Sequence, residues 1–388
     1  MDPPTPEKPR QHQTEEDVMI RKLHPDREER WGDGAEATFS YPVYIADSLH
    51  SVSEHSRQSF AKMVRAMAAD RQDVQPNGIV YDIIDPSLNA RLLDATEIEA
   101  ILRGKRKDDV EDGFRVAEEE EEEYEQTEDY RKEMSDKNYV AKLKNHEETL
   151  RLRGSFQWVP TVVKCRLHNG VRSAALQGDI SGLPERCFSS ISGPSYEAIE
   201  SIFSSMLPLF AKLDIENRQE SERRSSTCKK ESTALDVALQ DVSLQVVFKV
   251  QEYQIPPHSS YTGRWHTEGF SENVLAAGVY YVDVSEDTNG GDLSFRPSGT
   301  PDKPYYHGPE GDDSEEDRGP AFWSSFIKDV SVQTGTAVVF NNSIPHRFRT
   351  IRNDTDQVQC RLFMNFFVVD PSKELPATTS SLAGPSLL

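Results

Sequence analysis

Residues 360–371 read CRLFMNFFVVDP, and this stretch decides the fold class. Side chains alternate between two faces in an extended chain, so Arg361, Asn365 and two phenylalanines share one face. Both faces are largely apolar, which predicts a strand that is buried on both sides. Arg361 would then be a buried cation, and a buried cation needs an anion beside it. That anion is either an internal Asp or Glu or the carboxylate of a small dicarboxylic acid.

Other strand-like runs surround this one, separated by Gly, Asn and Pro turns and by no helical pattern. They cover 242–255, 273–285, 292–297 and 330–342. Further upstream, two strand-like runs flank Asn169-Gly170, which is the strongest short signal for a β-hairpin. The pattern predicts an antiparallel β-sandwich or barrel.

Amphipathic helices are expected on the N-terminal side of these strands, at 53–70, 95–103 and 195–214. Pro208 should kink or shorten the last turns of the third helix. We therefore expect an α+β organisation in four parts. These are a disordered tail (1–38), a helical acidic region (39–154) with a charged segment at 108–152, a β domain (155–372) and a flexible tail (373–388).

The net charge of the 388-residue chain is −22, and two segments carry most of it. Residues 108–129 contain thirteen acidic residues and one arginine, and residues 310–318 contain six and one. Nonspecific nucleic-acid binding needs clustered Lys and Arg, so no nucleic-acid partner is expected. The acidic segments either are simply solvated or recruit a basic protein partner.

The sequence has no apolar run of 18 residues and no signal-like N-terminus, and both features bear on the cellular location of the protein. The four cysteines are widely spaced and are expected to be reduced thiols. A cytoplasmic or nuclear protein without a membrane segment is therefore predicted.

A candidate metal site lies in YTGRWHTEGF (261–270), where His266 and Glu268 would project to the same side. His346 follows just past a later strand, in NNSIPHRF (341–348). Two histidines and one carboxylate on a β-scaffold are the ligands of a facial triad for Fe(II), and they also suit Mn(II) or Zn(II). A hydrogen-bonded structural histidine remains an alternative for His266, and His258 and His307 are competing ligands.

Several further side chains are secondary candidates for a ligand site. Arg296 and Arg347 could replace Arg361 as the anion-binding group, although an arginine at a strand end is usually a surface residue. Of Tyr280 and Tyr281, one should point inward and could hydrogen-bond a ligand, with core packing as the alternative for either tyrosine, and Tyr280 is the candidate of the two. Asn365 is a further candidate on its strand.

Seven short blocks of the sequence, taken in order, resemble a family of largely uncharacterised, mostly fungal proteins. That family is catalogued as a domain of unknown function and is related to the Fe(II)/2-oxoglutarate-dependent dioxygenases. The matching blocks are FQWVP (156–160), MLPLF (206–210), WHTEG (265–269), GVYYVDV (278–284), LSFR (293–296), FNNSIPHR (340–347) and CRLFMNFFVVDP (360–371). Glu268 stands where the wider superfamily usually has Asp.

The resemblance implies a double-stranded β-helix, that is, a jelly-roll or cupin-like core with helices packed on it. It implies Fe(II) on His266, Glu268 and His346, and 2-oxoglutarate with its C5 carboxylate on Arg361. The implied reaction oxidises a small-molecule or peptide substrate while 2-oxoglutarate is decarboxylated to succinate. Two alternatives remain open: a non-catalytic jelly-roll scaffold with acidic interaction segments, and a non-redox cupin-like metalloenzyme.

Overall fold

The computed structural model describes residues 19–23, 29–30, 36–37, 43–49, 51–69, 78–104, 155–168, 171–178, 180, 194–213, 242–295 and 327–376. The two acidic segments, Arg296 and His307 lie outside these residues. None of the helices in the described part is long and apolar enough to cross a membrane.

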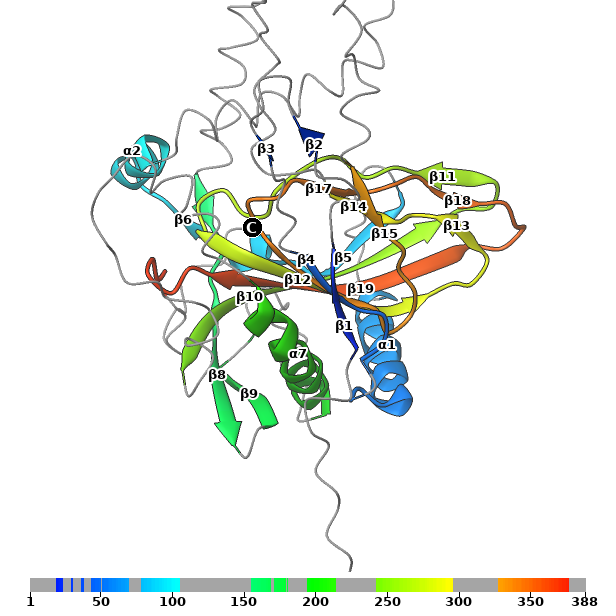
Figure 1. Ribbon diagram of the computed structural model, residues 1–388, viewed down its shortest axis with the longest axis horizontal. Helices are drawn as coiled ribbons and strands as arrows, with labels where there is room; N and C mark the ends of the chain where they lie inside the picture. Colours follow the sequence, from blue (N-terminus) through cyan, green and yellow to red (C-terminus); the bar gives the residue numbers. More distant parts are fainter. Residues whose placement is uncertain are drawn as a thin grey trace, which may run out of the picture.

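A nine-stranded antiparallel sheet forms the centre of the molecule (Figure 1). Its strands, in spatial order, are β1 (Ile20–Lys22), β4 (Val43–Ala46), β16 (Ala337–Asn341), β12 (Val274–Val284), β19 (Gln359–Val369), β10 (Ser243–Ile255), β8 (Thr161–His168) and β9 (Val171–Gln177), and β5 (Val80–Ile84) also pairs with β10.

Smaller antiparallel sheets complete the β-structure. One three-stranded sheet contains β11 (Ser259–Tyr261), β18 (Ile351–Asn353) and β13 (Thr288–Gly290), and another contains β15 (Lys328–Val330), β14 (Leu293–Phe295) and β17 (His346–Phe348). Two-stranded pairs are formed by β2 (Glu29–Arg30) with β3 (Glu36–Ala37) and by β6 (Arg91–Leu92) with β7 (Phe156–Gln157).

Helices cover one face of the central sheet, and the two three-stranded sheets cover the other (Figure 1). The face under α1 (Glu54–Ala69) and α7 (Pro194–Lys212) is called the helical face. The opposite face, which carries Val247, Tyr253, Ala277, Tyr281, Phe363 and Phe367, is called the inner face. Helix α2 (Ala95–Gly104) and the short 3₁₀ helix η2 (Pro86–Asn89) lie outside this arrangement.

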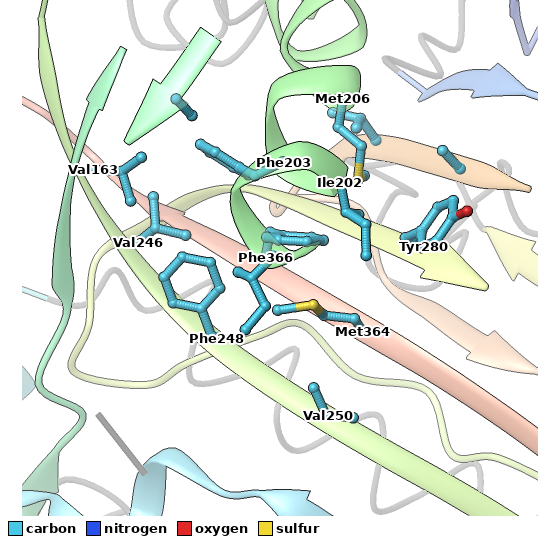
Figure 2. Close-up of a cluster of buried hydrophobic side chains, with 14 of the residues drawn as sticks. Val163, Ile202, Phe203, Met206, Val246, Phe248, Val250, Tyr280, Met364 and Phe366 are labelled. Atoms are coloured by element: carbon cyan, nitrogen blue, oxygen red, sulfur yellow. The ribbon is translucent and has the colours of Figure 1, made fainter. Parts of the chain in front are cut away.

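Strand β19 explains why two cores form. It pairs with β10 on one side and β12 on the other, so its backbone hydrogen bonds are satisfied within the sheet. Its even-numbered residues, such as Met364 and Phe366, enter the core against α7, as Figure 2 shows. Phe363 and Phe367 enter the inner core instead. The predicted strand with two buried faces is thus confirmed.

The three predicted helices are confirmed with small shifts in their ends, and the hairpin appears as β8 and β9, with His168 paired to Val171. Pro208 does not shorten the third helix, because α7 continues to Lys212. The predicted boundaries need correction at both ends. Strands β1, β4 and β5, from the predicted tail and N-terminal region, are strands of the central sheet.

The C-terminal boundary changes for a similar reason. Leu375, expected in the flexible tail, is buried, and its N–H donates to Gln245 Oε1 over 2.7 Å. These contacts join the start of the predicted tail to β10.

The helical core should be sensitive to loss of Phe366, which is fully buried and packs on Phe203 and Phe248 at ring-centroid distances of 5.2 and 5.7 Å. We expect Phe366→Ala to lower the free energy of unfolding by about 3–5 kcal/mol, through lost burial and the cavity left behind. Urea unfolding followed by circular dichroism measures this. Leu88→Ala is the matched control, because Leu88 is 50% exposed. Similar losses for the two variants would contradict this account of the core.

Candidate metal centre

The backbones of His266 and His346 are joined by a reciprocal pair of hydrogen bonds. The His266 N–H donates to the His346 carbonyl over 3.1 Å, and the His346 N–H donates to the His266 carbonyl over 3.0 Å. This isolated antiparallel bridge ties the connection between β11 and β12 to the first residue of β17. Two histidines 80 positions apart in the sequence therefore have paired backbones, and the centroids of their imidazole rings lie 4.4 Å apart.

Glu268 completes the cluster. Its Oε1 lies 3.3 Å from His266 Nε2 and 3.5 Å from His346 Nε2. One ligand atom from each of the three residues lies within 4.8 Å of the others. Metal–ligand bonds of about 2.0–2.2 Å put neighbouring ligand atoms about 3 Å apart in an octahedron, so the spacing fits three ligands on one face of an ion.

The other nitrogen of each imidazole faces a backbone carbonyl. His266 Nδ1 lies 2.7 Å from the Arg264 carbonyl oxygen, and His346 Nδ1 lies 3.4 Å from that of Ile344. A carbonyl oxygen only accepts, so we assign the proton to Nδ1 in both rings. The Nε2 atoms then face Glu268, and each can ligate a metal ion once it carries no proton.

Asn342 holds the backbone of Glu268 in place. Its Oδ1 accepts from the Glu268 N–H over 2.7 Å, and its Nδ2 donates to the Glu268 carbonyl over 2.7 Å and to that of Val274 over 3.1 Å. Nothing in the sequence distinguishes Asn342, because Asn in a turn is common. Its only signal was its place four residues before His346.

Gly269 follows the carboxylate and has a φ of +66°. A Cβ atom there would lie 2.9 Å from Glu272 Oε2 and 2.9 Å from Val274 Cγ2, so both the conformation and the space require glycine. Glu272 is buried and accepts from the backbone N–H groups of Trp158 and Ser271 over 2.9 and 3.0 Å. These contacts join the FQWVP stretch to the loop that carries the metal ligands.

The three side chains influence each other's protonation. Burial opposes ionisation of Glu268, but hydrogen bonds from both histidines and their charges outweigh it and lower its pKa well below the usual range. Partial desolvation disfavours the charged form of His266, but the hydrogen bond and charge of Glu268 outweigh that effect and raise its pKa. Burial and the neighbouring His266 lower the pKa of His346. One ionised carboxylate thus lies beside an imidazole that favours its neutral, ligating form.

Arg361 is buried on the inner face, with 1% of its surface exposed. Its guanidinium donates to the carbonyl oxygens of Gly291 and Gly290, and its Nε is buried without a hydrogen-bond partner. Within the described part of the chain, no carboxylate lies within ion-pair distance of Arg361. Burial therefore lowers the pKa of Arg361. The internal ion pair, one of the two alternatives above, is not found among these residues.

Gly291 has a φ of +77°, and a Cβ atom there would lie 2.5 Å from Arg361 Nη2. Only glycine leaves room for the guanidinium to reach the backbone at this point.

Tyr281 lies beside Arg361, with its ring centre 6.0 Å from the guanidinium carbon. Its hydroxyl is buried without a hydrogen-bond partner, and burial raises its pKa above the usual value. Tyr280 points the other way, into the helical core, as Figure 2 shows. The expectation that Tyr280 serves the site is therefore corrected, because neighbouring residues in a strand face opposite sides and Tyr281 shares the face of Arg361.

The remaining candidates lie apart from this anion position. Arg347 places its guanidinium over the Trp265 ring at 4.6 Å. His258 pairs with Asp356 at an exposed turn, 2.9 Å apart, and is not part of the histidine–glutamate cluster. Asn365 shares the inner face with Arg361 but lies four residues further along β19.

Comparisons with known proteins give one family match. The model of a family described as "Protein of unknown function (DUF4246)" matches residues 214–381. No curated protein matches the chain.

Among solved structures, the chain is similar to IDO from Bacillus thuringiensis at 11% identity, with a TM-score of 0.29, covering 55% of this chain and 73% of that one. It is also similar to a Pseudomonas putida prolyl-4-hydroxylase at 15% identity and a TM-score of 0.24, covering 45% and 63%. A Trichoplax adhaerens prolyl hydroxylase in complex with a hypoxia inducible factor peptide fragment gives 11% identity and a TM-score of 0.26, covering 47% and 60%. The chain thus spans less than two thirds of each hydroxylase.

Asn342 should be required for metal affinity although it is not a ligand. We expect Asn342→Ala to weaken Co(II) or Fe(II) binding by about 10- to 100-fold, as for other residues that orient metal ligands. Calorimetric titration with the metal measures the change. Asn289→Ala is the control, because Asn289 makes its hydrogen bond to Asp354 on the exposed surface. Unchanged metal affinity in Asn342→Ala would show that the loop holds Glu268 without this side chain.

Proposed function

We propose that this protein is an Fe(II)- and 2-oxoglutarate-dependent oxygenase with a jelly-roll core. The observation that carries the proposal is the convergence of His266, His346 and Glu268, each of which offers one ligand atom within 4.8 Å of the other two. Such a set occupies one face of an octahedral ion and leaves positions open for other ligands.

The residues fit the metal in composition as well as spacing. Two imidazoles and one carboxylate suit Fe(II), and the Nδ1 contacts with backbone carbonyls orient both rings with Nε2 toward Glu268. His346 is 4% exposed whereas the His266 side chain is 43% exposed. The cluster therefore has a buried side and a side that solvent or substrate reaches.

Arg361 and Tyr281 fit a carboxylate of 2-oxoglutarate. Both carry a buried polar atom without a partner, namely Arg361 Nε and the Tyr281 hydroxyl, and both of these atoms can donate a hydrogen bond. A buried guanidinium without a counter-ion is costly, and an entering carboxylate offsets that cost. The apolar rings of Phe348 and Phe363 around it exclude water.

When bound, iron and 2-oxoglutarate supply the oxidising chemistry, with succinate and carbon dioxide as coproducts. The chain's own residues hold and orient these groups. His266, Glu268 and His346 would fix the ion, Arg361 and Tyr281 would orient the cosubstrate, and Asn342 would keep Glu268 in position.

Anaerobic titration of the Fe(II)-loaded protein with 2-oxoglutarate tests the proposal. We expect the visible charge-transfer band of a metal-bound 2-oxo acid in the wild type, and loss of both the band and bound iron in His266→Ala. His258→Ala is the control, because this histidine lies outside the cluster. A His266→Ala variant that retains iron and 2-oxoglutarate decarboxylation would remove His266 from the site.

Arg361 should affect cosubstrate binding and not metal binding. We expect Arg361→Met to weaken 2-oxoglutarate binding at least about tenfold, since hydrogen bonds to a charged group each contribute roughly 1.5–3 kcal/mol. Iron content should stay at the wild-type level. Arg352→Met, at an exposed position of β18, is the matched control. Equal 2-oxoglutarate affinity in Arg361→Met and wild type would contradict the assignment.

The same titration separates the alternatives. A metalloenzyme without redox chemistry would hold Zn(II) or Mn(II) and turn over without 2-oxoglutarate. A scaffold would hold no metal at stoichiometric occupancy.

A further inference from the structure

We propose, on the basis of the function proposed above, that Lys249 and Asn365 bind a carboxylate of the substrate that is oxidised. The two residues form a second polar position on the inner face, separate from Arg361.

Strand pairing places these side chains in one row. Lys249 on β10 pairs with Asn365 on β19, and Asn365 pairs with Val279 on β12. Directly paired residues project to the same face of a sheet, and Val279 belongs to the inner core. Lys249 and Asn365 therefore project together into the space between the central sheet and the smaller sheets.

Both side chains have hydrogen-bonding capacity that the described residues do not use. Asn365 is 5% exposed, and its side-chain amide makes no hydrogen bond with another described residue. Its amide atoms are not among the fully buried atoms without a partner, so solvent or a ligand can reach them. The Lys249 Nζ makes one ion pair, with Asp82 Oδ1 at 3.5 Å, and that oxygen already accepts from Gln251 Nε2 over 2.6 Å.

The row lies level with the metal centre along the strands. Phe348 packs on Phe363, with ring centroids 5.3 Å apart. The centroids of the His346 and Phe340 rings lie 4.5 Å apart. Phe340 pairs with Ala277, and Ala277 pairs with Phe367, so these three residues form one row across the sheet. Strand β17 therefore carries His346 toward the Phe367 row and Phe348 toward the Phe363 row. Asn365 lies between these two rows.

Arg361 and the Lys249–Asn365 pair are distinct positions. Four residues of strand separate Arg361 from Asn365, or about 13 Å between their Cα atoms at ~3.3 Å per residue. Phe363 lies between them on the same face. One anion held on Arg361 therefore leaves the second position free for another molecule.

The chemistry of the row favours a carboxylate on an aliphatic body. An ammonium group and an amide NH₂ both donate, so together they suit a group that only accepts. Asp82 accompanies Lys249, which limits the excess positive charge and favours a single negative charge on the ligand. The residues that flank the row, Val279, Val247 and Ala277, are apolar and suit an aliphatic chain.

Hexanoate is a suitable probe, with hexanamide as its neutral partner. We expect hexanoate to bind the wild-type protein in the presence of anaerobic Fe(II) and 2-oxoglutarate, as measured by calorimetry, and hexanamide to bind at least about tenfold more weakly. Lys249→Met and Asn365→Leu should each weaken hexanoate binding about tenfold or more and change 2-oxoglutarate affinity less than about threefold. Arg361→Met should show the reverse pattern.

Controls keep the test interpretable. Lys249→Arg should restore binding, and Lys373→Met, at an exposed lysine near Asp370, should have no effect. Thermal unfolding checks that each variant folds. Unchanged hexanoate affinity in folded Lys249→Met and Asn365→Leu would overturn the inference, as would a wild type that does not bind hexanoate. A loss of 2-oxoglutarate affinity in Lys249→Met equal to that in Arg361→Met would also overturn it, by making Lys249 a cosubstrate ligand.

A second titration of the metal-free protein separates this inference from the proposed function. Lys249-dependent hexanoate binding by the metal-free protein, combined with no chelate band when Fe(II) and 2-oxoglutarate are added to the wild type, would support the carboxylate position and contradict the oxygenase. A normal chelate without hexanoate binding would do the opposite.

Discussion

The reciprocal hydrogen bond between the backbones of His266 and His346 is the constraint on which the site depends. It is a bridge of a single residue pair, and it joins the connection between β11 and β12 to the first residue of β17. Because the backbones are fixed, only side-chain rotation remains, and the carbonyls of Arg264 and Ile344 restrict that rotation. Asn342 fixes the third ligand in the same way, through its backbone.

The second constraint is the burial of charge on the inner face. Arg361 lies beside the aromatic rings of Tyr281 and Phe348 and donates to two backbone carbonyls, and Gly291 leaves room for its guanidinium. The carbonyls partly satisfy the guanidinium but do not neutralise it. A charged group kept in this state favours binding of an anion, at some cost to the stability of the empty protein. The inner face therefore combines apolar packing with a few polar atoms in fixed positions, which is typical of small-molecule sites.

Much of this arrangement could be predicted from the sequence, because it depends on local patterns. The alternation around Phe363, the Asn169-Gly170 turn and the spacing of His266 and Glu268 are all contained in short stretches. Pairing over long distances was not accessible. Strand β4 pairs with β16 almost 300 residues later, and the sequence assigned it to a separate region.

The choice between Tyr280 and Tyr281 failed for a related reason, since it depends on the register between β12 and β19. Asn342 acts through three backbone contacts that no motif encodes. Asn365 was visible only as one polar residue in an apolar strand.

The position of β19 between β10 and β12 has a consequence for how the protein tolerates change. Its two sets of side chains serve different purposes: one set seals the layer under the helices, and the other carries Arg361 and Asn365. A single inserted or deleted residue would exchange the two sets, sending a guanidinium under α7 and phenylalanines toward the metal. Length variation in this strand is therefore expected only in multiples of two residues, or at its ends. Length changes in the acidic segments 108–129 and 310–318 would leave the alternation of side chains in this strand unchanged.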